Sequence, residues 1–155
     1  MGTGFLVLLA KALAQVGLEA IVVGNVASIL NGAPVLTQDV DLLVRDTPLN
    51  GKKMKKLAAL LGGVGPTEVS GLTRVQRIEG SEYPIDFLFD ELGGSLRFAA
   101  VRSRSFKEEV GAFTLTVASL EDVIKAKQAA NRPKDRAVMP ILLDTLATRK
   151  ALDGR

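Results

Sequence analysis

The spacing of apolar and polar residues predicts helices and strands in alternation along this chain. Residues 4–14 form the most apolar N-terminal segment, and their helical spacing predicts an amphipathic helix that Gly17 ends. The β-branched run Glu19–Val23 predicts a first strand, and the apolar run Asp39–Val44 predicts a second. Between them, Gly24-Asn25 is a turn signal before a short helix over residues 26–30.

The rest of the chain predicts further elements of both kinds. Gly62–Pro66 is expected to break the chain, and Ser119 opens a motif similar to a capping box. Pro133 suits the first turn of the last helix. The expected helices are 52–61 (capped near Asn50), 95–101, 119–130 and 133–151. The expected strands are 72–78 and 83–89, similar to a hairpin, and then the short pair 105–110 and 112–117. The predicted fold class is α/β (α+β), a mixed sheet with flanking helices that ends in two C-terminal helices.

Composition narrows the chemistry more than it narrows the fold. With 155 residues, of which 47% are hydrophobic, we expect one folded domain. The chain has no Cys and no His, which excludes disulfides, thiol nucleophiles, Cys/His zinc sites and histidine bases. A net charge of +3 permits a polyanionic partner without requiring one. Residues 4–14 are too short to span a bilayer and lack a basic n-region, so we expect a cytoplasmic protein and no membrane partner.

The most informative motif is a pair of carboxylates in an apolar strand. Asp39 and Asp41 are separated by one residue, so a strand turns both side chains to the same face, roughly 6–7 Å apart. Two like charges on such a face repel each other and are costly to desolvate. Because a divalent cation would relieve this cost, and Mg²⁺ combines a few carboxylates with water and substrate phosphates, the pair indicates phosphate chemistry.

Asp86 is the third acidic candidate. It lies in a second apolar strand, and it could join the pair if the two strands are neighbours. Three converging aspartates would suit a two-metal phosphoryl-transfer site. We favour Asp86 over Asp90, because Asp90 opens the following loop. The alternative is that Asp86 is an ordinary carboxylate at a strand end or edge.

Other segments are weaker candidates for binding phosphate. Gly24-Asn25 follows a strand and opens a helix, where backbone amides bind phosphate well, although an ordinary tight turn is equally consistent with it. Gly51-Lys52-Lys53 is not a phosphate loop, because position 46 is Asp46 rather than glycine. Four basic residues also stand close in sequence, but without an aromatic platform we favour a solvated surface over an RNA site. These four residues are Arg97, Arg102, Arg104 and Lys107.

Together these segments resemble the nucleotidyltransferase superfamily, which includes DNA polymerase beta and the minimal nucleotidyltransferases. The pattern is a strand, a glycine turn into a helix, an Asp-x-Asp strand and a third Asp on a later strand. Here it is Val23-Gly24-Asn25, Thr37-Gln38-Asp39-Val40-Asp41 and Ile85-Asp86-Phe87. The segment Ile124–Asp135 is similar to the tail of stand-alone and abortive-infection toxin-type members. The resemblance covers residues 20–146 and implies a single nucleotidyltransferase-like domain over residues 1–155.

The resemblance also implies roles for individual residues. Asp39, Asp41 and Asp86 would be both the metal ligands for Mg²⁺ (or Mn²⁺) and the catalytic residues. Asp86 would bind the ion that activates the acceptor hydroxyl, or would act as its base. A second set would bind the nucleotide, and Arg132 and Asp135 would support it. The nucleotide-binding residues would be Gly24, Asn25, Thr37 and Lys127. Asn25 stands where the family usually has Ser or Gly.

The function implied by the resemblance is transfer of a nucleotidyl group from a nucleoside triphosphate, such as ATP, to a hydroxyl on RNA, protein or a small molecule. One alternative is a non-catalytic nucleotide-binding or toxin–antitoxin module with a cognate antitoxin or partner chain. Another is a scaffold in which the aspartates are only structural. A response to metal ions would argue against the scaffold, and turnover would argue against the binding module.

Overall fold

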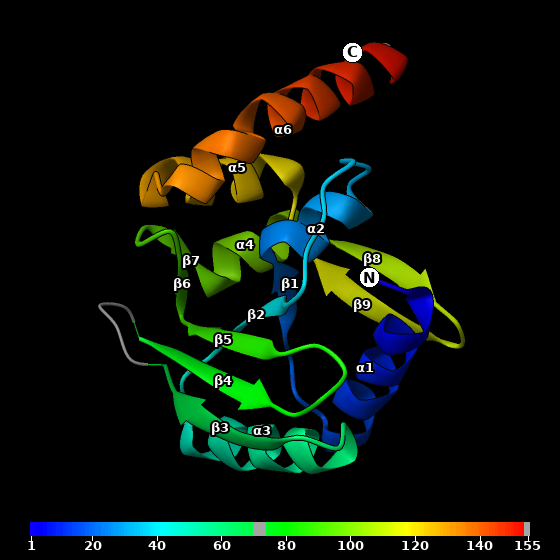
Figure 1. The fold of residues 1–155 in the computed structure, drawn as a ribbon, viewed down its shortest axis with the longest axis vertical. Helices are drawn as coiled ribbons and strands as arrows, with labels where there is room; N and C mark the ends of the chain where they lie inside the picture. Colours follow the sequence, from blue (N-terminus) through cyan, green and yellow to red (C-terminus); the bar gives the residue numbers. More distant parts are fainter. Residues whose placement is uncertain (70–73, 154–155) are drawn as a thin grey trace.

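Seven strands form one sheet in the order β3-β4-β5-β2-β1-β9-β8 in the computed structural model, which describes residues 1–69 and 74–153 (Figure 1). The pairs β2/β5 and β1/β9 are parallel and the other neighbours are antiparallel, so the predicted mixed sheet is confirmed. The strands of the sheet are β1 (Ile21–Val23), β2 (Val40–Val44), β3 (Val64–Glu68), β4 (Val75–Glu79), β5 (Ile85–Phe89), β8 (Phe106–Val110) and β9 (Phe113–Val117). A separate small ribbon pairs β6 (Glu91–Leu92) with β7 (Leu96–Arg97).

Six helices accompany these strands in the described residues. They are α1 (Thr3–Val16), α2 (Gly24–Leu30), α3 (Pro48–Leu60), α4 (Phe98–Arg104), α5 (Leu120–Ala130) and α6 (Pro133–Leu152). Gly17 ends α1 in the left-handed conformation, at φ 68°. Ser119 caps α5 by accepting a hydrogen bond from the amide of Asp122, as its position in the sequence predicts. The two predicted C-terminal helices are therefore confirmed.

Two predicted helix starts are wrong, and local chemistry explains both. α3 begins at Pro48 rather than near Lys52, because the Thr47 hydroxyl accepts a hydrogen bond from the Asn50 amide and caps the helix there. α4 begins at Phe98 rather than Ser95, because residues 96–97 pair with residues 91–92 in the small ribbon.

The chain break predicted over Gly62–Pro66 is also corrected. Residues 61–63 form a turn, but β3 begins at Val64 and runs through Pro66 as the outermost strand of the sheet. An edge strand tolerates proline, because the missing amide hydrogen is not needed by a second neighbour. The strand predicted over 72–78 is described only from Val75 onward, and Leu72 lies outside the described residues.

The helices divide into two groups around the sheet. α1 contacts α3 and packs on β8 and β9, and α3 packs on β3 at the bottom of Figure 1. α2 packs on β1 and β2 and contacts α5. The buried hydrophobic residues of the described chain form one cluster. No helix in the described part of the chain is long and apolar enough to cross a membrane.

The buried side-chain amide of Asn31 links the C-terminal helix α6 to the rest of the fold by hydrogen bonds. Asn31, at the end of α2, donates hydrogen bonds to the carbonyl oxygens of Ala27 (2.8 Å) and Ala118 (3.1 Å). Its Oδ1 accepts a hydrogen bond of 2.6 Å from Nη1 of Arg149, on α6. This network joins α2, the end of β9 and α6, and so it fixes the C-terminal helices relative to the glycine turn.

Candidate active site

A row of charged side chains crosses the middle of the sheet. In the strand register, Arg77 of β4 pairs with Asp86 of β5, Asp86 with Asp41 of β2, and Asp41 with Val23 of β1. Residues paired across strands share a face of the sheet. Asp39 lies in the bend just before β2, and its Oδ2 comes within 3.4 Å of Nη2 of Arg77 on that face. The structure therefore brings together the three aspartates that the sequence singles out, next to the turn that follows Val23.

Asp41 is the electrostatic centre of this row. Its side chain is half-buried, and its pKa is raised from 3.8 to about 6, mainly by burial. The negative charges of Asp86 and Asp39 contribute to this rise, while Lys127 and Lys134 act in the opposite direction. In the described part of the chain, no hydrogen bond or ion pair satisfies this carboxyl group. The site therefore holds more negative charge than its own residues neutralise.

Asp86 has a different environment, because Arg77 holds it. The guanidinium of Arg77 donates to both carboxylate oxygens of Asp86, from Nε at 2.6 Å and from Nη2 at 2.8 Å. The same Nη2 lies 3.4 Å from Oδ2 of Asp39. The hydrogen bond with Asp86 is the main cause that raises the pKa of Arg77, which therefore remains charged. Arg77 thus supplies a fixed positive charge inside the aspartate cluster.

The glycine turn fits closely around Asp41. Gly24 has a φ of +65°, and a Cβ built on it would lie 2.1 Å from Oδ2 of Asp41, so only glycine leaves room for that carboxylate. Asn25 follows as the second residue of α2. Its Oδ1 is buried and has no hydrogen-bond partner within the described residues. The turn and the carboxylate therefore share one tightly packed corner.

Thr37 fixes the approach of the chain to β2. Its hydroxyl donates a hydrogen bond of 3.0 Å to the carbonyl oxygen of Asp39 and accepts one of 3.4 Å from the Asp39 amide. This local turn orients Asp39 just before the strand begins. Whether Thr37 also contacts a nucleotide stays a prediction.

The C-terminal helices place a second charged group over the aspartates. Asp135 is fully buried and accepts hydrogen bonds from the side chain and the backbone amide of Arg132, at 2.7–3.2 Å. Nζ of Lys127 lies 3.7 Å from Oδ1 of Asp135. Burial would raise the pKa of Asp135, but the hydrogen bonds from Arg132 outweigh this effect and lower it. Burial lowers the pKa of Lys127, against the attraction of Asp135 and Asp41.

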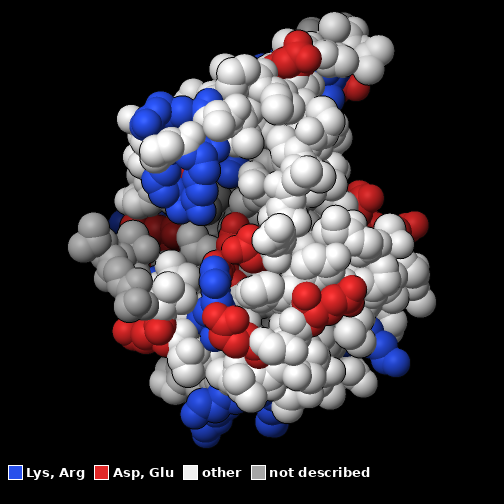
Figure 2. Space-filling model, viewed as in Figure 1, with Lys and Arg blue, Asp and Glu red and all other residues white. Residues whose placement is uncertain are grey.

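The two charged groups face each other across the molecular surface. In Figure 2, acidic side chains gather near the middle of the view, below basic side chains that lie over the region of α5 and α6. Arg132 and Lys134 are exposed at the start of α6, and both interact electrostatically with Asp41. This arrangement suits a ligand that carries negative phosphates next to a bound cation.

The carboxylates fit a divalent cation in part. Asp39 and Asp41 offer hard oxygen donors on one face, and Asp41 lacks a counter-ion within residues 1–69 and 74–153. However, no group of three or more His, Cys, Asp or Glu side chains in those residues is arranged to hold a metal ion. The pair Asp39–Asp41 therefore fits Mg²⁺ or Mn²⁺ completed by water and phosphate, because Arg77 approaches only one oxygen of Asp39, at 3.4 Å, whereas it binds both oxygens of Asp86.

Sequence reasoning missed Arg77. The predicted hairpin does not reveal it, because a symmetric turn between strands 72–78 and 83–89 would pair residue 86 with residue 75, whereas the observed register pairs Asp86 with Arg77. Sequence reasoning also gave no role to Lys134, whose charge acts on Asp41. By contrast, Asp90 accepts a hydrogen bond from the Asp46 amide and lies outside the row, in line with the preference for Asp86.

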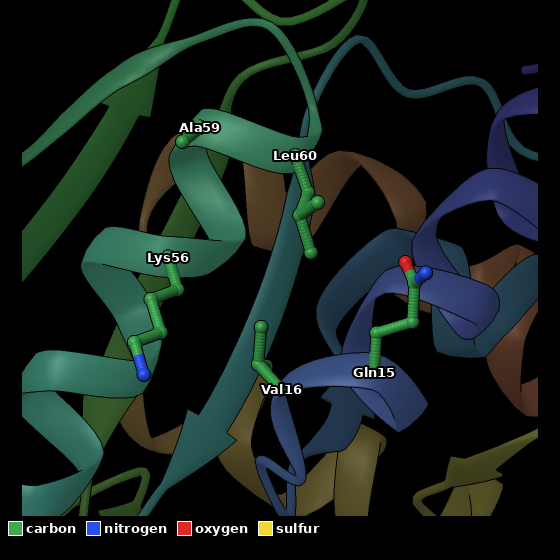
Figure 3. A pocket seen from close by; sticks show the side chains of 5 residues that line it. All are labelled: Gln15, Val16, Lys56, Ala59 and Leu60. Atoms are coloured by element: carbon green, nitrogen blue, oxygen red, sulfur yellow. The ribbon is translucent and has the colours of Figure 1, made fainter.

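Two other features lie away from the aspartates. A hollow of about 480 Å³ between α1 and α3 is lined by short or aliphatic side chains and by the exposed ends of Gln15 and Lys56 (Figure 3). It contains no acidic group. The predicted basic cluster is exposed, and two of its members are paired, Arg102 with Glu19 and Arg104 with Asp122. Neither feature belongs to the aspartate site.

The fold and the aspartate row define a nucleotidyltransferase-like protein, and comparison with known families agrees. The chain belongs to the family described as "Nucleotidyl transferase of unknown function (DUF2204)", whose model matches residues 4–152. The family implies a nucleotide substrate and nucleotidyl transfer in general. A search of curated proteins found no significant match.

Solved structures of the same fold include antibiotic-resistance factors. The solution structure of ANT(2″)-Ia is 14% identical with a TM-score of 0.66, and it covers 96% of this chain and 85% of that protein. The crystal structure of ANT(2″)-Ia in complex with adenylyl-2″-tobramycin is 16% identical with a TM-score of 0.62, covering 96% and 91%. A Thermotoga maritima protein assigned as a nucleotidyltransferase is 14% identical with a TM-score of 0.58, covering 95% and 89%. At these identities the likeness establishes the fold.

Proposed function

We propose that this protein transfers a nucleotidyl group from a nucleoside triphosphate to a hydroxyl acceptor in a metal-dependent reaction. The observation that carries the proposal is the position of Asp41. It lies between Asp39 and Asp86 on one face of the sheet, against the Gly24 turn and without a counter-ion in the described residues. Membership of a nucleotidyl transferase family supports the same chemistry.

In this proposal the three carboxylates have two different roles, metal binding and proton transfer. Asp39 and Asp41 would hold Mg²⁺ or Mn²⁺, and the cation would neutralise phosphate charge. The acceptor oxygen bonds to the α-phosphorus, pyrophosphate leaves, and Asp86 takes the acceptor proton. Because Arg77 occupies both oxygens of Asp86, that last role requires the ion pair to open.

The nucleotide-binding residues in this proposal surround the carboxylates. The turn at Gly24 and Asn25 faces the β- and γ-phosphates, and Thr37 orients the start of β2. Lys127 contributes positive charge from α5. The buried carboxylate of Asp135 forms ion pairs with both Lys127 and Arg132. These roles agree with the electrostatic coupling of Lys127 to Asp41.

The test is transfer of α-labelled ATP, CTP, GTP and UTP in Mg²⁺ to three acceptor classes, which are total RNA, protein and an aminoglycoside. The aminoglycoside is included because ANT(2″)-Ia has been solved with an adenylylated tobramycin. We expect label in one class with the wild type and none with Asp41→Asn. The matched control is Asp144→Asn, which removes an exposed carboxylate on α6 and should leave transfer unchanged. Full transfer by Asp41→Asn would end the proposal.

A second candidate is a nucleotide-binding module without turnover. The specific observation in its favour is the bidentate ion pair between Arg77 and Asp86, which leaves neither oxygen of the third carboxylate available to an acceptor hydroxyl. This candidate predicts nucleotide binding that depends on Lys127, with no transfer to any acceptor class. In its toxin–antitoxin form it also predicts a partner chain that copurifies with the protein.

A further inference from the structure

Arg77 forms ion pairs with several carboxylates of the site. Its guanidinium approaches three carboxylates, with Asp86 at 2.6 Å, Asp39 at 3.4 Å and Glu79 at 3.8 Å. The contact with Asp86 is bidentate, and the Asp86 side chain is only 14% exposed. Bidentate pairs of this kind are stronger and more strictly oriented than single hydrogen bonds. Arg77 is therefore a built-in positive charge at the third carboxylate.

A divalent cation and this guanidinium would compete for the same oxygens. A metal ion on Asp86 would lie next to the positive charge of Arg77, because both carboxylate oxygens already accept hydrogen bonds from it. Two positive charges at that separation repel strongly in a partly dehydrated site. Asp41 lies on the other side of Asp86 in the strand register and faces no such competitor, since no ion pair involves it within the described residues.

We propose that Arg77 is a positioning residue that occupies Asp86 and excludes a divalent cation from it until the ion pair opens. This inference rests on the proposed function, because it concerns the same three carboxylates. It predicts that the free protein binds one divalent cation, on Asp39 and Asp41, and that a second position appears when Arg77 releases Asp86. The row of three aspartates is then a one-cation site in the form that the structure shows.

The test counts Mn²⁺ bound to the full chain in the absence of nucleotide, by the loss of the free Mn²⁺ signal in electron paramagnetic resonance. We expect one site in the wild type. In Arg77→Ala we expect a second site, because the competitor for both Asp86 oxygens is removed, together with about tenfold tighter binding of the first ion, because a neighbouring positive charge is removed. Tighter binding of the first ion with no second site would contradict the inference. Arg77→Lys keeps the charge but loses the bidentate geometry, and we expect it to bind Mn²⁺ more tightly than the wild type by a smaller factor. Arg77→Lys also keeps the inference testable if Arg77→Ala fails to fold.

The matched control is Arg74→Ala. Arg74 lies three residues earlier, also carries one positive charge and pairs with Asp46, outside the aspartate row. We expect Arg74→Ala to bind Mn²⁺ as the wild type does. Unchanged Mn²⁺ stoichiometry and affinity in both Arg77 variants would overturn the inference while leaving metal-dependent transfer intact. Absence of Mn²⁺ binding in every protein would overturn it together with the metal part of the proposed function.

Discussion

Replacing Asp41 by Asn should stabilise the fold while removing the proposed activity. The carboxyl group is half-buried, faces two other aspartates and has no ion pair within the described residues. The free energy of unfolding therefore contains an unfavourable contribution whenever Asp41 is ionised. Asparagine has nearly the same shape but no charge, so Asp41→Asn removes that contribution without creating a cavity.

The size and the pH dependence of the gain follow from the pKa. Burial, together with the charges of Asp86 and Asp39, raises the pKa of Asp41 from 3.8 to about 6, and a rise of about 2 corresponds to about 3 kcal/mol. Below pH 4 the group is protonated in both folded and unfolded chains, so it costs nothing. Between pH 4 and 6 the folded chain binds more protons than the unfolded chain, and its stability falls as the pH rises. Above pH 6 the full cost remains.

The assay is urea denaturation at pH values from 4 to 8, with Asp144→Asn as the control for loss of an exposed carboxylate. We expect Asp41→Asn to match the wild type near pH 4 and to exceed it by up to about 3 kcal/mol at pH 8. Asp144→Asn should follow the wild type throughout. A constant difference across the pH range, or a variant less stable than the wild type at pH 8, would refute this reasoning.

Three further changes test other parts of the site. Gly24→Ala should abolish transfer in the transfer assay and lower the melting temperature more than Gly32→Ala does. Both glycines have positive φ, but of the two only Gly24 has an atom within 4 Å of an added Cβ. Asp135→Ala should cost about 3–5 kcal/mol in urea denaturation, because it leaves Lys127 buried without its carboxylate. Asn31→Ala should cost about 1–3 kcal/mol in the same assay, because a buried carbonyl oxygen loses its donor, and an unchanged midpoint would contradict this.

The sequence predicts the central part of the site because that part is local. Strand alternation predicts Asp39 and Asp41 on one face, although β2 begins only at Val40 and Asp39 lies in the bend before it. Gly24 is identified as a turn from its position after a β-branched run. The pairing of β2 with β5, which brings Asp86 beside Asp41, is a long-range fact. The sequence predicts that Asp86 joins Asp39 and Asp41 only if the two strands are neighbours, and the structure shows that they are.

The missed features depend on interactions that apolar patterning does not reveal. β3 has an exposed Val64 and an internal Pro66, so it carries no strand-like alternation and is held as an edge strand by its pairing with β4. Arg77 is inconspicuous in a strand of mixed polarity until the hairpin register places it opposite Asp86. Thr47 followed by Pro48 signals the start of α3, whereas the cap was expected near Asn50, and so the helix was predicted to begin too late.

The treatment of other carboxylates in this chain bears on whether Asp41 is merely structural. Asp122 and Asp135 are both fully buried, and each is neutralised by an arginine, Arg104 and Arg132 respectively. Asp41 is left without such a partner in the described residues, although two neighbouring aspartates make its charge more costly. A fold that pairs its structural carboxylates but leaves this one unpaired accepts a local cost that a bound cation would remove. This contrast favours a ligand-binding role for Asp41 over a structural one.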